Sequence, residues 1–260
     1  MNAATLTLDA VTFAYHGVPI LDDIHLAVRE GEFLCLLGPS GSGKSTLLRL
    51  LAGLESPQRG AIHWWGQPIA GPGIDRGVVF QDYSLFPWFS VADNIALAIG
   101  KAYPALNKAR RRELAREYLA QVGLEDAADK YPLELSGGMR QRGAIARALA
   151  LGSPMLLMDE PFGALDTLNR ARLQDLLLDV WQNATPRKTI VFVTHDIDEA
   201  LYLGDRVAVL GAAPAQVIAD YPVPFDRPRD RRPLFTSAQF HQLRETIADA
   251  LSADTLAHLN

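Results

Sequence analysis

The sequence predicts an α/β fold built on a mainly parallel sheet, and two patterns support this class. Apolar runs recur at residues 33–37, 77–80, 155–158 and 189–194, as expected for strands buried on both faces of a sheet. Segments with helical spacing separate several of these runs, and parallel strands need such crossover connections. Residues 5–35 differ, because apolar and polar residues alternate there and predict an N-terminal antiparallel β patch.

A glycine-rich segment with the pattern G-x-x-x-x-G-K-[ST] follows the predicted strand at residues 33–37. A helix is predicted directly after it, which is the context that this motif requires. Glycines let consecutive backbone N–H groups surround an anion, and the helix N-terminus adds positive potential. Lys44 can reach the β- and γ-phosphates, Ser45 can bind Mg²⁺, and Thr46 can contact an inner phosphate. The chain is therefore predicted to bind a nucleoside triphosphate through Gly38, Pro39, Ser40, Gly41, Ser42, Gly43, Lys44, Ser45 and Thr46.

The composition narrows the class of protein. At 260 residues and 48% apolar, the chain can form one large α/β domain, or a core with a subdomain. Its net charge of −5 gives no basic field, so no nucleic-acid partner is expected. The one cysteine, Cys35, lies in an apolar strand and is expected to be a buried small hydrophobe. The N-terminus lacks a secretory signal and no apolar run approaches the ~20 residues that span a bilayer, so a cytoplasmic protein is expected, held at any membrane by another chain.

Polar residues follow four of the predicted strands: the phosphate loop, Gln81, Asp159-Glu160 and His195. Ligands of open parallel sheets bind at the carboxyl ends of the strands, so we expect these residues to form one site. Asp159 is suited to Mg²⁺, and Glu160 can orient or deprotonate the attacking water. His195 can donate to the γ-phosphate, and Gln81 can bridge metal and water. These groups predict phosphoryl transfer to water.

Helical spacing at residues 107–122 and 139–151 predicts a helical insert over about residues 86–150. The insert is expected within a domain of residues 1–220. Residues 221–260 are expected to form a C-terminal tail that is partly helical. We interpret the arginines from Arg227 to Arg232 as a linker rather than a site for a polyanion.

A second predicted anion site lies at the start of the alanine-rich helix. It combines the hydroxyl of Ser136 with the bare backbone N–H groups of Gly137 and Gly138. One bound triphosphate does not need two such sites within a chain. With Gln81, Asp159-Glu160, Ala164-Leu165-Asp166 and His195 in this order, residues 5–215 resemble the ATP-binding-cassette (ABC) ATPases.

This resemblance implies a RecA-like P-loop NTPase core, with ATP and Mg²⁺ as cofactors. It implies a head-to-tail homodimer, with ATP between the phosphate loop of one subunit and the Ser136-Gly137-Gly138 segment of the other. Tyr15 would stack on adenine, and Asp166 would lie across the interface. Catalysis would depend on Glu160, His195, Gln81 and Lys44, and the metal on Ser45, Gln81 and Asp159. Gly143 departs from the family, where a bulkier apolar residue is common, so the packing of its helix is in doubt.

Residues 71–81, 85–88 and 158–166 are similar to the cassettes of nitrate, sulfonate and taurine importers. This similarity implies ATP-driven uptake of a small anion, with taurine or another alkyl sulfonate, or nitrate, expected first. Permease subunits would dock near Asp82–Val91, whose aromatic residues could instead pack internally. A periplasmic or extracellular solute-binding protein would act indirectly, and the chain would lie at the cytoplasmic face of the inner membrane. The alternatives are a soluble cassette ATPase, a regulator without turnover and a small-molecule kinase. We favour the importer, because the chain has one cassette, intact Glu160 and His195, and the Ser136 segment.

Overall fold

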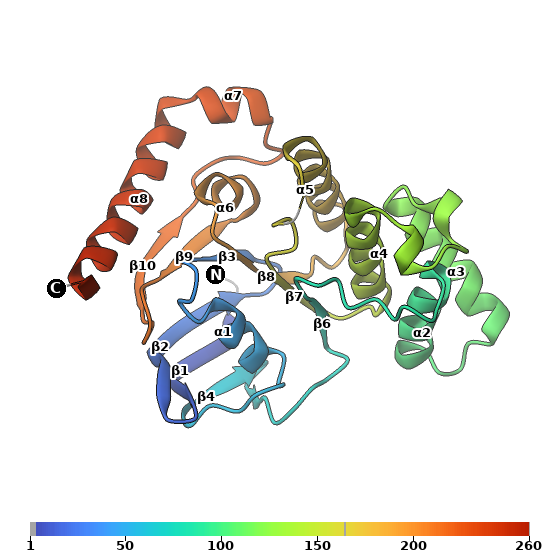
Figure 1. The fold of residues 1–260 in the computed structure, drawn as a ribbon, viewed down its shortest axis with the longest axis horizontal. Helices are drawn as coiled ribbons and strands as arrows, with labels where there is room; N and C mark the ends of the chain where they lie inside the picture. The colour runs from blue at the N-terminus through green and yellow to red at the C-terminus, as the bar shows by residue number, and fades with distance from the viewer. Residues whose placement is uncertain (1–3, 164, 260) are drawn as a thin grey trace. The chain divides into compact units, whose positions relative to one another are not determined.

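The structure is a computed structural model that describes residues 4–163 and 165–259 (Figure 1). The described residues divide into two compact units. The first unit combines Met1–Pro72 with Thr189–Asn260, and the second is Gly73–Lys188. Ala164, part of the motif with Leu165 and Asp166, lies outside the described residues.

The first unit contains the predicted antiparallel patch. Strand β1 (Ala4–Tyr15) pairs with β2 (Val18–Arg29) and with β4 (Arg59–Trp64), and β5 (Gln67–Pro68) pairs with β4. Apolar residues on one face of these strands are buried, which explains the alternation in the sequence.

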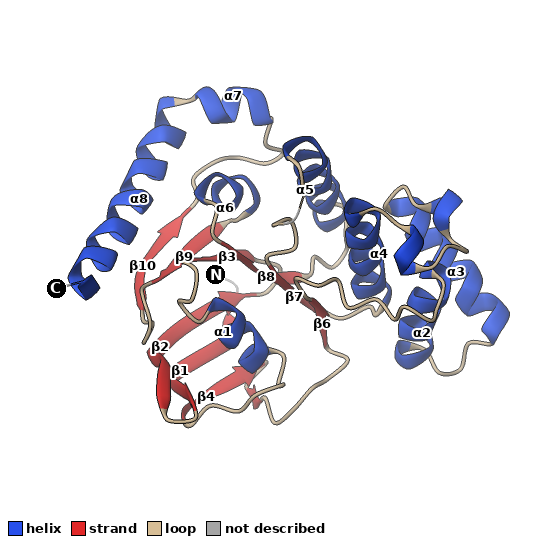
Figure 2. Cartoon of the chain, viewed as in Figure 1, coloured by secondary structure: helices blue, strands red, loops and turns tan. Residues whose placement is uncertain are grey.

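The same unit contains the strand that leads into the phosphate loop. Strand β3 (Phe33–Leu37) runs parallel to both β8 (Thr189–Thr194) and β9 (Arg206–Leu210), and β10 (Val217–Pro222) pairs antiparallel with β9. Every residue of β3 and β8 is buried, as the uninterrupted apolar runs predicted. Cys35 is buried too, and burial raises the pKa of its thiol, which confirms the interpretation as a small hydrophobe. Helices α1 (Lys44–Leu51) and α6 (Ile197–Leu203) follow β3 and β8 (Figure 2).

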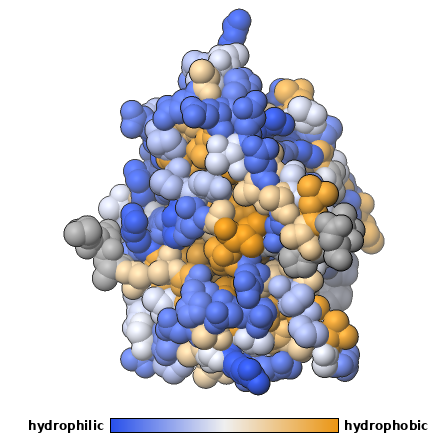
Figure 3. Space-filling view, turned by 90° about the vertical axis from the view of Figure 1, so that its left-hand side faces the viewer, coloured by the Kyte–Doolittle hydropathy of each residue, from blue (hydrophilic) through white to orange (hydrophobic). Residues whose placement is uncertain are grey.

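The C-terminal segment is more ordered than the sequence suggested. It forms α7 (Arg231–Thr236) and the long helix α8 (Ala238–Leu259), drawn in red in Figure 1. Phe240 and Ile247 of α8 are buried. The interpretation of Arg227–Arg232 as a linker is wrong, because Arg229 is buried and hydrogen-bonded to the α6 end. Figure 3 shows the side of the molecule that carries α8, hydrophilic with an apolar patch near its middle.

The second unit contains two parallel strands and four helices among its described residues. Strand β6 (Arg76–Val79) runs parallel to β7 (Met155–Asp159). The helices are α2 (Val91–Ala102), α3 (Lys108–Gln121), α4 (Gly137–Ala150) and α5 (Thr167–Gln182), with short 3₁₀ turns at Glu125–Ala127 and Pro132–Glu134. The predicted helices at residues 107–122 and 139–151 are therefore confirmed, α4 beginning two residues earlier.

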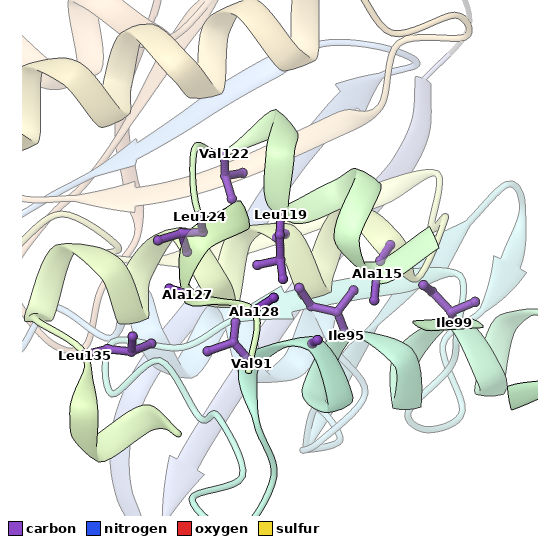
Figure 4. Close-up of a cluster of buried hydrophobic side chains, with 13 residues drawn as sticks. Val91, Ile95, Ile99, Ala115, Leu119, Val122, Leu124, Ala127, Ala128 and Leu135 are labelled. Atoms are coloured by element: carbon purple, nitrogen blue, oxygen red, sulfur yellow. The ribbon is translucent and has the colours of Figure 1, made fainter. Parts of the chain in front are cut away.

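Helices α2, α3 and α4 share a hydrophobic core, shown in Figure 4. Ile95 and Ile99 of α2 and Leu119 of α3 are fully buried, and Tyr118 packs partly buried against them. The arginines at residues 110–112 remain largely on the solvent side, where Arg110 pairs with Glu113 at 2.7 Å. The short side chains of the α4 alanines allow these helices to approach closely.

Gly143 has a packing reason that the sequence did not show. A Cβ atom at this buried position would lie 3.1 Å from Cγ1 of Val91 and 3.4 Å from Cδ1 of Leu85. A larger side chain would therefore push against the start of α2 and the segment before it. Glycine in a helix costs about 1 kcal/mol relative to alanine, and here that cost accompanies close packing.

Candidate functional site

The pairing of β3 with β8 brings two predicted site segments to one edge of the first unit. Leu37 is the register partner of Thr194 in this parallel pair. The phosphate loop begins at the residue after Leu37, and His195 is the residue after Thr194. The phosphate loop and His195 therefore both start at the carboxyl ends of neighbouring parallel strands, where such sheets bind ligands.

Two glycines of the phosphate loop are required by its backbone. Gly41 and Gly43 have φ values of +83° and +87°, a left-handed conformation that side chains disfavour. A Cβ on Gly43 would also lie 2.9 Å from Cγ2 of Ile20 and from Cδ2 of Leu21. The loop thus curls tightly against β2 while its backbone remains close to any ligand.

Lys44 is the first residue of α1 and is 4% exposed. Its Nζ donates hydrogen bonds to the carbonyl oxygens of Gly38 at 2.9 Å and Pro39 at 2.8 Å. These bonds hold the ammonium group over the loop, where a triphosphate requires positive charge. The next residue, Ser45, is exposed in the first turn of α1, and Thr46 is half-buried.

Helix α1 begins without a capping side chain, since its N-cap is Gly43. Helices α2 and α3 instead begin with Ser90 and Asn107, whose side chains accept backbone hydrogen bonds. The first N–H groups of a helix are natural anion donors when no side chain caps them. This end of α1 and the loop before it therefore fit the phosphates of a nucleotide.

Tyr15 ends β1 and is half-buried. Its ring packs edge-to-face on Phe13, with 4.7 Å between centroids and 85° between planes. This contact restricts the orientation of the ring. Stacking on adenine stays a prediction.

The second unit holds the other strand-end residues. Val79 of β6 is the register partner of Met158 of β7. Gln81, two residues beyond β6, is exposed, while Asp159 ends β7 and is 9% exposed. The parallel register thus brings Gln81 and the Asp159-Glu160 pair to the same edge of this unit.

Glu160 has an unusual backbone conformation. Its φ of +42° lies in the left-handed region, which a long side chain rarely adopts. Such a conformation costs on the order of 1–3 kcal/mol and is concentrated at functional sites. The carbonyl oxygen of Glu160 accepts a hydrogen bond from the N–H of Gly163 at 3.2 Å, which closes the turn. The chain therefore turns directly after the end of β7, at Glu160.

Ser136, Gly137 and Gly138 form the start of α4. The hydroxyl of Ser136 caps the helix by accepting a hydrogen bond from the N–H of Met139 at 3.3 Å. Neither glycine has a positive φ. A Cβ on Gly137 would lie 3.9 Å from the Tyr83 hydroxyl, and one on Gly138 3.8 Å from Cδ2 of Leu165. These are ordinary contact distances, so packing within the described chain does not require glycine at either position.

Asp166 caps the N-terminus of α5. Its carboxylate accepts hydrogen bonds from the backbone N–H of Asn169 at 3.1 Å and from its side-chain amide at 2.6 Å. The backbone bond from Asn169 is the main reason that the pKa of Asp166 is lowered. The carboxylate is therefore charged and exposed at the start of the helix.

Sequence reasoning did not single out the residues that organise the segment after Gln81. The guanidinium of Arg147 donates to the carbonyl oxygens of Ser84 and Tyr83, and burial lowers its pKa. The buried amide of Asn94 accepts from the N–H of Phe86 at 2.7 Å and donates to its carbonyl at 3.1 Å. An arginine within an alanine-rich helix gives no sequence signal of this role.

The side chains predicted to bind a metal ion are few and all offer oxygen atoms. The described ranges, 4–163 and 165–259, contain no cluster of three or more His, Cys, Asp or Glu side chains that could hold a metal ion. The predicted magnesium ligands are Ser45 in the first unit and Gln81 and Asp159 in the second. A hydroxyl, an amide and a carboxylate are oxygen donors of the kind that Mg²⁺ prefers, and binding of Mg²⁺ by these residues stays a prediction.

No helix among the residues that the structure describes is both long enough and apolar enough to cross a lipid bilayer.

The glycine-rich loop at the carboxyl end of a buried parallel strand defines a nucleotide-binding protein of the phosphate-loop class. The family described as ABC transporter matches residues 21–163, more than half of the chain. The chain belongs to this family and is an ATPase of the ABC class.

Relatives and solved structures agree with this assignment. The nitrate import ATP-binding protein NrtD of Synechococcus elongatus is 48% identical over 232 residues, which cover 89% of this chain and 84% of NrtD. The bicarbonate transport ATP-binding protein CmpD of the same organism is 45% identical, covering 89% of this chain and 83% of CmpD.

The dimeric bacterial ABC transporter cassette MJ0796 has a similar structure, with a TM-score of 0.76 and 35% identity over 85% of this chain and 100% of that one. Its dimeric post-hydrolysis state, bound to ADP and Pi, has a TM-score of 0.74 and 33% identity, with the same coverage. The predicted fold class is thus confirmed.

Proposed function

We propose that this chain is the ATP-hydrolysing subunit of an importer and works as a homodimer with two shared nucleotide sites. The observation that carries the proposal is the unexplained pair of glycines at the start of α4. Packing leaves room for a side chain at Gly137 and Gly138, yet both positions are bare beside the Ser136 hydroxyl. A phosphate group from a second subunit accounts for this arrangement, and the dimeric state of the similar cassette supports it.

The proposed roles rest on the sequence motifs and on the resemblance to the ABC ATPases. Gly38–Thr46 would bind the phosphates of ATP, with Tyr15 against the adenine. Ser45, Gln81 and Asp159 would hold Mg²⁺, which neutralises charge on the phosphates when bound. Glu160 would accept the proton of the attacking water, and His195 would donate a hydrogen bond to the γ-phosphate. Asp166 would lie at the subunit interface.

The domain proposal keeps residues 1–220 as the ABC ATPase domain, with residues 86–150 as its helical subdomain. Helices α2, α3 and α4 lie within this insert and share a hydrophobic core of their own. Residues 221–260 would be a C-terminal addition that packs on the ATPase domain.

The segment Asp82–Val91 is the proposed docking site for permease subunits. Trp88 is 66% exposed, and Phe86 and Phe89 are also exposed. The three rings contact one another, with centroid distances between 5.5 and 6.4 Å. An apolar hollow of about 420 Å³ lies beside them, lined by Val78, Phe86, Asn94, Leu97, Ala98, Lys101, Arg147, Ala148 and Leu151.

The side chains of Arg147 and Asn94 form hydrogen bonds with the backbone of this segment, at Tyr83, Ser84 and Phe86. These bonds hold the segment in one conformation. Exposed apolar groups gathered around a hollow are typical of interaction sites. A short helix of a membrane subunit would place apolar side chains in the hollow. Internal packing of these aromatics, the alternative, is not what their exposure indicates.

Changing Trp88 and Phe89 to aspartate is expected to release the protein from membranes that contain its permease. Two charged groups in the docking surface would have to be desolvated, which costs several kcal/mol. Co-sedimentation with membranes should therefore be lost, while binding of a fluorescent ATP analogue to the purified variant should stay at the parental level.

Trp65→Asp is the matched control, since Trp65 is 52% exposed and lies in a turn of the first unit with a φ of +48° that aspartate tolerates. Membrane binding should survive this change. Co-sedimentation of the Trp88 and Phe89 double variant at the level of the Trp65 control would argue against the docking site.

The proposed solute is a small oxyanion, namely nitrate, bicarbonate or an alkyl sulfonate such as taurine. Two of the relatives are named for import of nitrate and transport of bicarbonate. Taurine and other sulfonates rest on the sequence resemblance alone. The chain would lie at the cytoplasmic face of the inner membrane as a peripheral subunit, with a solute-binding protein on the far side.

Reconstitution of the chain with its permease and solute-binding protein tests the proposal. We expect ATP hydrolysis to be stimulated by one of nitrate, bicarbonate or taurine and not by chloride at equal ionic strength. Full hydrolysis in the absence of membrane subunits, with no association with them, would favour the alternative of a soluble cassette ATPase.

A further inference from the structure

Helix α6 connects directly to His195 through its N-cap, Asp196. The carboxylate of Asp196 accepts a hydrogen bond from the N–H of Glu199 at 3.1 Å. The helix has seven residues, and isolated helices of this length are unstable in water. Contacts with the rest of the first unit must therefore hold α6, and with it the residue that precedes its cap.

Arg229 binds the opposite end of α6. Its Nη1 donates to the carbonyl oxygens of Leu201 at 3.0 Å, Tyr202 at 2.7 Å and Gly204 at 2.8 Å. The last carbonyls of a helix lack partners within the helix and carry negative potential, so a guanidinium group suits them. Nε and Nη2 of Arg229 donate to the carbonyl of Phe225 at 3.3 and 3.2 Å. Arg229 is 8% exposed, and desolvation lowers its pKa to about 10, which leaves it protonated at neutral pH.

Two more arginines of the C-terminal segment contact the same region. Nε of Arg244, on α8, donates to Oδ1 of Asp198 near the start of α6 at 2.7 Å, in a half-exposed pair. Nε of Arg227 donates to Oδ1 of Asp205 at 2.8 Å. Oδ2 of Asp205 in turn accepts the N–H of Phe33 at 3.0 Å, at the start of β3. The C-terminal segment thus holds both α6 and the strand that leads to the phosphate loop.

We infer that Arg229 is a positioning residue that fixes α6 and thereby the position of His195, which directly precedes the N-cap of that helix. The inference rests on the proposed role of His195 in hydrolysis. Arg244 contributes to the same positioning at the other end of α6. Neither arginine belongs to the phosphate loop, so ATP binding is preserved when either contact is removed.

Arg229→Gln is expected to lower kcat for ATP hydrolysis about tenfold, with KM for ATP changed less than about threefold. Arg229→Lys keeps the positive charge but lacks the planar set of guanidinium donors. Its kcat should therefore lie between that of the parent and that of Arg229→Gln. If Arg229 only stabilises the fold, the variant should instead contain a smaller fraction of active protein, which titration of active sites measures. The kcat per active site and the KM for ATP should then equal those of the parent.

The decisive comparison uses His195→Ala as a background. If Arg229 acts through His195, Arg229→Gln lowers the single-turnover rate less than about twofold in that background, because the effects of coupled residues are not additive. A full tenfold loss there overturns the inference and leaves the role of His195 intact. Parental hydrolysis by His195→Ala alone refutes the proposed role of His195 instead.

The exposed pair provides a test that does not depend on the folding of an Arg229 variant. Arg244→Asp places two like charges together and should lower kcat about two- to fivefold, while a surface pair has little effect on stability. Asp198→Arg combined with Arg244→Asp reverses the pair and should restore the parental kcat. A parental kcat in Arg244→Asp, or no restoration in the reversed pair, overturns the inference.

Discussion

Glu160→Gln is expected to stop ATP turnover while ATP binding persists. Glutamine has nearly the shape of glutamate but cannot accept the proton of the attacking water. General base catalysis contributes about 10²–10⁴-fold, so phosphate release should fall by that factor. Because ATP is then not consumed, the closed dimer that binds it should accumulate. Phosphate release, nucleotide binding and light scattering measure the three parts of this result.

Glu113→Gln is the matched control, since it makes the same chemical change on the exposed side of α3, where Glu113 pairs with Arg110. Its turnover should equal that of the parent. Phosphate release by Glu160→Gln at the parental rate would show that Glu160 is not the base.

Ser136→Arg is expected to prevent ATP-dependent dimerisation. The change adds a long side chain at the point where the phosphates of the second subunit's nucleotide would approach Gly137 and Gly138. It also removes the cap on Met139, which costs about 1 kcal/mol of helix stability. In the Glu160→Gln background, light scattering with ATP should show dimers for the parent and monomers for the added Ser136→Arg change.

Asn107→Arg separates these two effects. Asn107 caps α3 by accepting a hydrogen bond from the N–H of Arg110 at 2.9 Å, so its loss has a comparable effect on helix stability. Dimerisation should be unchanged in that variant. Equal dimerisation of the Ser136 and Asn107 variants would refute the role of the second anion site.

Local patterns in the sequence predicted much of the fold. Apolar residues are continuous in the strand before the phosphate loop, alternate in the antiparallel patch and recur with helical spacing in α3. Each spacing follows from the geometry of the element itself. Asp196 lies three residues before Glu199, which is the spacing of a capping box, and its carboxylate accepts the Glu199 N–H. Such features depend on neighbours within a few residues, so a single sequence displays them.

Features that depend on distant residues were not visible. Arginine-rich segments normally indicate solvated chain, and only the folded chain brings Arg229 to the carbonyls at the end of α6. The positive φ of Glu160 and the close contact of Gly143 with Val91 are likewise products of tertiary packing. The contacts that hold the predicted site residues come from segments far away in the chain, so a single sequence does not display them.

The left-handed conformation of Glu160 depends on the structure around it rather than on the residue itself. A residue in that conformation relaxes to another one as soon as its surroundings loosen, because the free chain disfavours it. The backbone conformation of Glu160 is therefore held by β7 and by the turn that the Gly163 N–H closes. A short peptide of the same sequence would not keep this conformation. Mutations that destabilise β7 should therefore change the orientation of the Glu160 side chain, although Glu160 itself is not mutated.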